Sequence, residues 1–371
     1  MLTLVQQAQQ IAPIRKPGST RGRRDVRNTI FVPSPQSPEP AAAETSALPP
    51  ASQFRTGRTG TLSSEDHTGS DTQSIRSSHS LSSMGGGLVK HPDLNQPGLN
   101  ASIVETVSAW FQNGQVTKAI MVGELALAYN STNTSPPSST EGVRLENFSV
   151  LEKVAPNTAF ITQVPERSGE YVATLSSLAR TAVAFKYQVH LEEATLPSHA
   201  PMVLTTTWKI ENQQASVILG YAFNPAFASA AKRNVSMRNV TIGVALEGAK
   251  ATICQSKPVG TFSKEKSMIY WKLGDITLDQ YDSGPHKLLA RFSTETEAKP
   301  GNVEARWEIS GEDAIGLGSG LSISHQDHSV EGVREEGLDP FADEGVTPTS
   351  SALWKEIPVV RTLISGKYIA V

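Results

Sequence analysis

Cysteine, long apolar runs and excess positive charge are all scarce in this chain of 371 residues. The single cysteine, Cys254, excludes an internal disulfide framework and a cysteine-based zinc site. No apolar run approaches the roughly 20 residues that a membrane-spanning helix needs. The formal net charge of −3 gives no overall basic field, so nucleic acid is not an expected partner.

The composition indicates that only part of the chain folds. Apolar residues make up 38% and charged residues 19%, both low for a fully globular protein. Residues 1–97 are crowded with Ser, Pro, Gly, Thr and Arg and show no lasting periodicity. Such a segment cannot offset the ~1–2 kcal/mol per residue that backbone ordering costs. We therefore expect a disordered tail over residues 1–97 and a folded domain over 98–371.

Positive charge gathers near the start of this tail. Residues 1–97 carry ten Lys and Arg against seven Asp and Glu, a net charge of +3, which leaves −6 for residues 98–371. Six basic residues cluster around Asp25, namely Arg15, Lys16, Arg21, Arg23, Arg24 and Arg27. A flexible basic cluster is attracted to an anionic membrane by about 1 kcal/mol per residue near the surface. A solvated charge run or a localisation-like patch is the alternative.

Two serine–proline pairs lie just beyond the basic cluster. Ser34 and Ser37, each followed by proline, resemble proline-directed phosphorylation sites. Phosphate at either serine would offset the nearby positive charge.

An alternating stretch in the middle of the chain, residues 202–225, is typical of a β-hairpin. Met202, Leu204 and Trp208 fall on one side of an extended chain, because side chains alternate across a strand. Residues 211–214 form a polar turn. A second strand follows and ends at Asn224-Pro225, because proline has no N–H for the ladder.

Strand-like runs follow one another through the rest of the folded part. One short helix is expected over residues 101–111, capped by Asn100 and ended by Asn113-Gly114. Parallel crossovers need helices, so the scarcity of helices predicts an all-β domain of packed, mostly antiparallel sheets. The predicted strands are 118–129, 143–150, 158–164, 171–175, 183–191, 239–246, 251–261, 267–273, 287–294, 303–309, 318–324, 359–364 and 368–371.

A polar, acidic segment over residues 326–349 interrupts the strands near the end of the chain. A loop of this length within a compact domain is usually functional or mobile. The motif Asp339-Pro340-Phe341 stands at its middle and is suited to act as a peptide ligand. Phe341 would enter a partner's pocket, and Asp339 would set the orientation. The alternative is a chance match, because short motifs recur often.

No group of residues indicates catalysis, a metal site or a cofactor site. His325 and His328 have the spacing of a metal-binding pair on a helix, but their surroundings are not helical. The glycine run 316–320 resembles a phosphate-binding loop but lacks the following helix, which favours a turn at a strand end. Cys254 lies in a strand-like run, as a buried apolar residue would. We therefore expect a non-enzymatic protein without a metal or cofactor.

Several segments, taken together, resemble the fungal muniscins, which are membrane-bending F-BAR adaptors of endocytosis. Residues 22–35 (GRRDVRNTIFVPSP) are similar to the start of their linker, and 99–129, 208–225 and 353–371 are similar to parts of their C-terminal mu-homology domain. The resemblance implies an elongated all-β domain of two β-sandwich subdomains, one inserted into the other. No segment resembles the helical F-BAR domain, so we expect a fragment, a short isoform or a truncated gene model.

The resemblance also implies a cytoplasmic, non-enzymatic adaptor, peripheral at plasma-membrane endocytic sites. Its implied partners are transmembrane cargo tails, scaffold proteins with EH domains, the clathrin adaptor complex and anionic phosphoinositide membrane. The alternative is a medium-chain-like structural subunit of a vesicle coat complex. The tyrosine-signal pocket of adaptor medium chains has no residue-by-residue match in this sequence.

Overall fold

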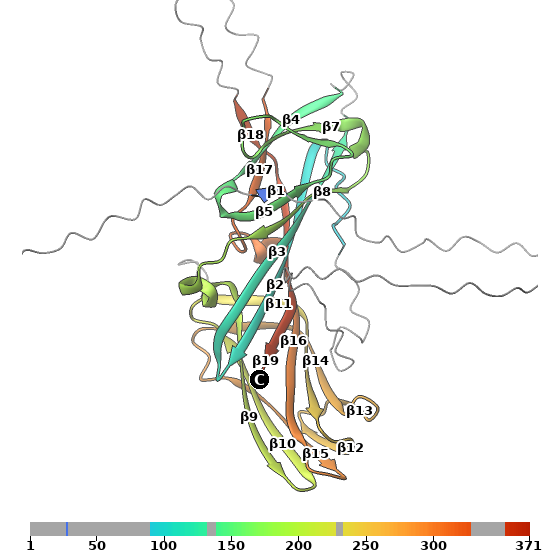
Figure 1. The fold of residues 1–371 in the computed structure, drawn as a ribbon, viewed down its shortest axis with the longest axis vertical. Helices are drawn as coiled ribbons and strands as arrows, with labels where there is room; N and C mark the ends of the chain where they lie inside the picture. The colour runs from blue at the N-terminus through green and yellow to red at the C-terminus, as the bar shows by residue number, and fades with distance from the viewer. Residues whose placement is uncertain (1–26, 29–89, 132–138, 228–232, 328–352) are drawn as a thin grey trace, which may run out of the picture.

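The computed structural model describes residues 27–28, 90–131, 139–227, 233–327 and 353–371. The predicted tail, residues 1–97, lies outside the described residues except for 27–28 and 90–97, and so does most of the predicted loop 326–349. The described residues form an elongated body of β-sheets, which confirms the predicted all-β class (Figure 1). None of the helices in these parts of the chain has the length and apolar character needed to cross a bilayer.

A long hairpin of β2 (Gly98–Gln112) and β3 (Gln115–Asn130) opens the folded part. Asn113 and Gly114 form its two-residue turn, with φ of 51° and 77°. Positive φ at both positions is the pattern of a tight hairpin turn, for which Asn-Gly is the preferred pair.

The prediction of a helix over residues 101–111 is therefore wrong, because this segment belongs to strand β2. Most of β2 is buried on both of its faces, so buried residues also recur at helix-like spacing. Neighbouring Ile103 and Val104 are β-branched and favour a strand over a helix. The Asn100 side chain, expected as a helix cap, instead donates to the carbonyls of Gln96 and Gly98.

The last strand, β19 (Val359–Ala370), joins the two halves of the molecule. It pairs in parallel with β2 and antiparallel with β16 (Lys299–Ser310) in a single ten-stranded sheet. Two strands were expected here, at 359–364 and 368–371. A register shift between Ser365 and Tyr368 interrupts the pairing with β2 but leaves one continuous strand.

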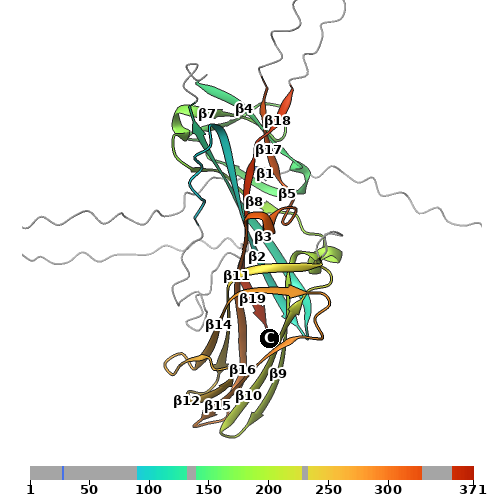
Figure 2. The same ribbon diagram turned by 180° about the vertical axis from the view of Figure 1, so that it is seen from behind.

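The first sandwich packs one end of the ten-stranded sheet against a five-stranded sheet (Figures 1 and 2). Its share of the ten-stranded sheet is β1, β5, β8, β3, β2 and the start of β19, and the five-stranded order is β18, β17, β4, β7, β6. The bounds not yet given are β1 Arg27–Asn28, β4 Thr140–Glu146, β5 Leu151–Pro156, β6 Ile161–Gln163, β7 Glu170–Thr174, β8 Ala182–Val189, β17 Ser322–Gln326 and β18 Trp354–Glu356.

The second sandwich is inserted between β8 and β17 of the first. It packs β16, β11, β14 and β13 of the ten-stranded sheet against a four-stranded sheet in the order β12, β15, β10, β9. The bounds are β9 Met202–Glu211, β10 Gln214–Phe223, β11 Asn234–Glu247, β12 Ala251–Lys257, β13 Thr261–Ser263, β14 Met268–Asp279 and β15 His286–Thr294. The predicted hairpin over 202–225 is confirmed as β9–β10, with Trp208 opposite Val217.

Short 3-10 helices account for several differences from the predicted strands. The run 143–150 ends as a strand at Glu146 and continues into η2 (Phe148–Val150), and the run 318–324 becomes strand only at Ser322. Strand β5 was not predicted. The remaining short helices are η3 Leu175–Leu178, η4 Glu193–His199 and η5 Gly311–Ala314.

A close approach across three strands fixes the centre of the first sandwich. Glu105 on β2 lies opposite Gly123 on β3, which lies opposite Tyr187 on β8. A Cβ atom on Gly123 would come within 2.2 Å of the Tyr187 ring, so only glycine admits the ring. The Tyr187 hydroxyl thereby reaches across β3 and donates to the Glu105 carboxylate at 2.9 Å.

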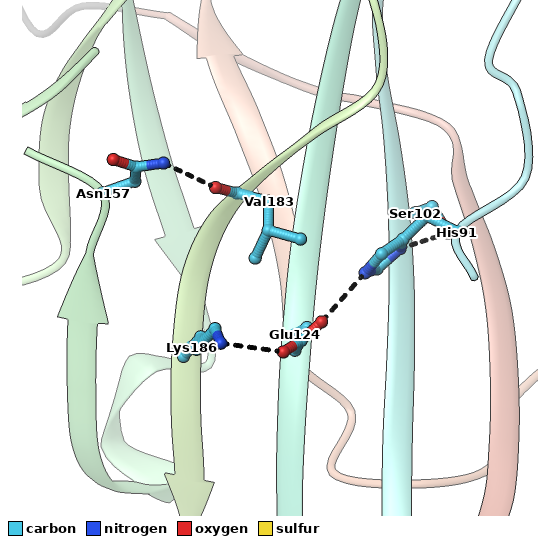
Figure 3. Close-up of polar contacts among 6 residues, drawn as sticks. All are labelled: His91, Ser102, Glu124, Asn157, Val183 and Lys186. Atoms are coloured by element: carbon cyan, nitrogen blue, oxygen red, sulfur yellow. Dashed lines mark hydrogen bonds and ion pairs between the residues drawn. The ribbon is translucent and has the colours of Figure 1, made fainter. Parts of the chain in front are cut away.

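A polar cluster holds the segment before β2 against the sheet (Figure 3). Glu124 on β3 lies between Lys186 Nζ at 3.3 Å and His91 Nε2 at 3.8 Å, and the other His91 nitrogen lies 3.1 Å from the Ser102 hydroxyl. The His91 ring has the largest effect on the pKa of Glu124 and lowers it. Partial burial raises this pKa, and Lys186 lowers it again, so the net shift is downward.

We expect Gly123→Ala to lower the free energy of unfolding by about 1–3 kcal/mol, because the added methyl group overpacks against the Tyr187 ring. Urea denaturation measures this change. Val122→Ala is the matched control, since the Val122 side chain is 42% exposed on the same strand. Equal stability of the two variants would contradict the close approach.

We expect Glu124→Gln to destabilise the protein near neutral pH, because the variant loses the ionic contacts with Lys186 and His91. The loss should be only about 0.5–1 kcal/mol, because Glu124 is partly exposed. A carboxylate whose folded-state pKa is lowered stabilises the fold above its unfolded pKa, and this contribution disappears as the pH falls through the folded-state value. The difference in melting temperature from wild type should therefore shrink as the pH falls below the ordinary glutamate pKa of 4.5. Glu265→Gln, in an exposed turn, is the control and should melt at the same temperature as wild type at both neutral and acidic pH. A gap that persists in acid would exclude this ionic contribution.

Candidate functional site: a pocket at the start of the last strand

A pocket of about 570 Å³ lies where the chain passes from β18 into β19. Residues 356–361 line one side, Ser322 of β17 lies at its edge, and η5 with the residues after it lines the other side. Ile315 and Val360 form part of its wall and are 65% and 44% exposed, whereas Ile357 is buried. The pocket thus presents aliphatic surface to an incoming ligand.

Arg361 contributes a positively charged group to this pocket. Its side chain is half-buried, and its Nη2 donates to the carbonyl oxygen of Leu321. Its Nη1 is buried and finds no hydrogen-bond acceptor among the described residues. Leaving a buried donor without an acceptor costs about 1–3 kcal/mol, more for a charged group. Because Nη1 is shielded from solvent, a ligand oxygen reaches it only when the side chain turns toward the pocket.

Two carboxylates also line the pocket. Glu312 of η5 and Glu356 of β18 are both exposed. They would repel a ligand that carries negative charge along its whole length. The arrangement therefore favours a ligand with one anionic or carbonyl oxygen for Arg361 and an apolar group for the aliphatic wall.

A buried carboxylate lies behind the pocket and is held by the glycine run 316–320. Glu105 is fully buried, and it accepts hydrogen bonds from the Ser319 backbone N–H at 3.0 Å and from the Ser319 hydroxyl. Gly318 has a φ of 82°, and a Cβ atom there would lie 1.9 Å from a Glu105 oxygen. The run is therefore a turn, as predicted, and the anion that it holds is a side chain of the same protein.

Arg361 lies close enough to this buried group to act on it electrostatically. Burial raises the pKa of Tyr187 well above its ordinary value, and the Glu105 carboxylate raises it further. The charge of Arg361 acts in the opposite direction and lowers the pKa of Tyr187. Tyr187 remains a neutral donor to Glu105, and Arg361 is held between this cluster and the pocket.

The predicted partner motif Asp339-Pro340-Phe341 lies outside the described residues. The two ends of its segment are joined, because the N–H of Asp327 donates to the carbonyl of Leu353 at 2.7 Å and β17 pairs with β18. The same two strands carry Ser322 and Glu356, which line the pocket. The segment that carries the motif is therefore connected to the fold at the end of β17 and the start of β18.

The predicted membrane and phosphorylation residues are not part of this pocket. Arg27 belongs to β1, whose backbone pairs in parallel with β5 opposite Lys153. The other predicted tail residues lie outside the described residues, namely Arg15, Lys16, Arg21, Arg23, Arg24, Ser34 and Ser37.

The other candidates from the sequence show no site geometry. Burial raises the pKa of the half-buried Cys254 thiol to about 12, so the reactive thiolate is disfavoured. His325 Nδ1 lies 3.2 Å from Glu141, and His328 is outside the described residues. In the part of the chain that the structure describes, no group of three or more His, Cys, Asp or Glu residues is arranged to hold a metal ion.

Arg361 was not predicted from the sequence as a residue of a binding site. One signal was present, because this arginine stands in a mostly apolar run, residues 359–364 (VVRTLI), at the start of a predicted strand. A charged residue in such a run needs either a partner or a ligand.

Comparison with known proteins supports one family. The family model described as the muniscin C-terminal mu homology domain matches residues 97–371. The protein "Suppressor of yeast profilin deletion" of Saccharomyces cerevisiae is 32% identical over 301 residues, which are 78% of this chain and 32% of that protein. "Cytoskeletal protein syp1" of Schizosaccharomyces pombe is 26% identical over 267 residues, 67% of this chain and 31% of that protein. The chain thus spans about a third of the length of these relatives.

A solved structure has the same fold. The Fcho1 mu homology domain of Danio rerio, with bound Eps15 peptide, superposes with a TM-score of 0.51 at 19% sequence identity. The match covers 74% of this chain and 97% of that one. Together with the two sandwiches joined by β19, the match of the family model over residues 97–371 shows that this chain belongs to the muniscin family and carries its C-terminal mu homology domain.

Proposed function

We propose that this chain is a non-enzymatic endocytic adaptor whose mu homology domain captures short peptides in the pocket beside Arg361. The observation that carries the proposal is a pocket with aliphatic walls that is lined by Arg361, a cationic residue whose Nη1 has no acceptor among the described residues. The Fcho1 structure supports the class of ligand, because that domain holds an Eps15 peptide.

The chemistry of the pocket selects a short peptide with one acceptor and one apolar side chain. A carboxylate or carbonyl oxygen of the peptide bonds to Arg361, and an aromatic or aliphatic side chain covers Ile315 and Val360. Apolar anchors with a charged partner are typical of the few residues that dominate a small interface. Scaffold proteins with EH domains are the proposed source of such peptides, and transmembrane cargo tails are a second source.

The remaining parts of the proposal rest on the sequence. The basic cluster from Arg15 to Arg27 attaches the protein to anionic phosphoinositide membrane, and phosphate at Ser34 or Ser37 weakens this attachment. The protein is then cytoplasmic and peripheral at plasma-membrane endocytic sites. The motif Asp339-Pro340-Phe341 binds the clathrin adaptor complex. Membership of the muniscin family supports an adaptor over the alternative of a coat-complex subunit.

We expect Ile315→Ser with Val360→Ser to weaken binding of the Eps15 peptide by roughly tenfold or more, because the peptide loses part of its apolar contact. Isothermal titration calorimetry measures the affinity, which we expect to be micromolar for the wild type. Both side chains are exposed, so the melting temperature should change little. Val122→Ser, an exposed site on β3, is the control. Equal affinity of the double variant and the control would exclude this pocket.

We expect Phe341→Ala to abolish capture of the appendage domain of the clathrin adaptor complex in a pull-down with the full chain, because the ring is the proposed anchor of the motif. Val333→Ala, in the same segment, should leave capture intact. The melting temperature should not change in either variant, because β17 and β18 pair without the motif. Undiminished capture by Phe341→Ala would remove the motif from the proposal.

A further inference from the structure

The outer face of the four-stranded sheet combines positive charge with exposed apolar side chains. On β15, Leu288, Ala290 and Phe292 point into the sandwich and are buried, so the residues between them point outward. Lys287 and Arg291 are among these outward residues, and both are exposed. The face is formed by the middle strands β10 and β15 and the edge strands β9 and β12.

The register places cationic and aliphatic residues side by side. Leu289 on β15 lies opposite Ile218 on β10 and, on its other side, opposite Lys257 on β12. Leu289 and Ile218 are 39% and 45% exposed, and Ile253 on β12 is 61% exposed. Large aliphatic side chains in contact with solvent on three neighbouring strands are not explained by packing within the domain.

The charges on this sheet are nearly all of one sign. Its strands carry four Lys and Arg but one carboxylate, Glu211, which pairs with Lys209 at 2.8 Å. The four cations are Lys209, Lys257, Lys287 and Arg291. This excess of positive charge contrasts with the folded part as a whole. Residues 98–371 have a formal charge of −6, which is the total of −3 minus the +3 of residues 1–97.

The opposite sheet of the same sandwich provides an internal comparison. Strands β11, β14 and β16 carry four Lys and Arg and five Asp and Glu, so the charges there nearly cancel. Arg238 lies directly opposite Glu308, and Lys299 opposite Glu247. The one-sided charge is therefore specific to the four-stranded sheet.

An apolar tip extends this face beyond the end of β12. Val259 follows Lys257 and Pro258 and is 92% exposed. The tip is fixed from both sides, because Trp271 Nε1 donates to the Pro258 carbonyl at 2.8 Å and the Gly260 N–H donates to the Ser256 hydroxyl at 2.9 Å. The fold holds an aliphatic side chain in solvent next to a lysine.

We propose that this face of the four-stranded sheet, with its Val259 tip, docks on an anionic membrane surface. The cations match phosphate headgroups, and the aliphatic side chains suit the interfacial region of a bilayer. A broad lipid surface fits better than an added peptide strand, because the exposed cations and aliphatic side chains are spread over all four strands, whereas a peptide strand would pair only along edge strand β9 or β12. The inference goes beyond the proposed function, which assigns lipid binding to the tail alone.

The test measures sedimentation of the full-length chain with vesicles of phosphatidylcholine and phosphatidylserine. We expect Lys257→Glu with Lys287→Glu to weaken binding at least about tenfold, since each basic residue near the surface contributes about 1 kcal/mol. The control, Arg238→Glu with Lys272→Glu, makes the same change in net charge at exposed positions on the opposite sheet. We expect the control to lose far less. Equal losses in the two double variants would overturn the inference.

Two further arms separate this inference from the proposed function. Replacing Arg21, Arg23, Arg24 and Arg27 by Ala tests the tail alone. If that variant loses vesicle binding and the sheet variant does not, the tail proposal stands and the inference fails. If only the sheet variant loses binding, the inference stands and the tail proposal fails. The sheet variant must also bind the Eps15 peptide like wild type, since a loss confined to the peptide would identify a protein interface.

Discussion

The pairing of β19 with two neighbours that belong to different sandwiches is the constraint on which the rest of the structure depends. Strand β19 lies between β2 and β16, and among the described strands no other connects the two parts of the ten-stranded sheet. Its pairing with β2 is parallel, so it cannot be closed by a hairpin and requires a long intervening chain. That chain includes the whole inserted sandwich, β9 to β16. Tyr368 secures the junction, because its buried hydroxyl donates to the carbonyl of Met202 at the start of β9 and accepts from the Met202 N–H.

The same strand determines where the pocket forms. Val360 and Arg361, at the start of β19, line the pocket together with residues of η5 and the glycine run 316–320. Ser319 of this run donates a hydrogen bond to the Glu105 carboxylate on β2. Glu105 is held in turn by Tyr187, which crosses β3 only because residue 123 is glycine. Arg361 therefore stands on a rigid support, which lowers the entropy that a bound peptide would have to offset.

The sequence was informative where the signal was local. The hairpin β9–β10 was predictable because alternation, a polar turn and Asn224-Pro225 all act within a few residues of one another. Strand β2 was misjudged as a helix because burial of both its faces removes the alternation that distinguishes a strand. The pocket was not predictable, since it depends on contacts between Glu105 and Ser319, which are far apart in the sequence. The exposed cations of β12 and β15 become a common face only through their register.

The pocket and the cationic face lie in different sandwiches. The ten-stranded sheet runs through both sandwiches (Figure 1). The two surfaces share no residue, so a ligand at one leaves the other accessible. A short peptide in one pocket buries little surface, and a small interface gives modest affinity. When the face and the tail both touch a membrane, the second contact forms at high effective concentration. A peptide partner bound at the pocket is then held near the same membrane, which is the physical requirement for an adaptor that links partners to lipid.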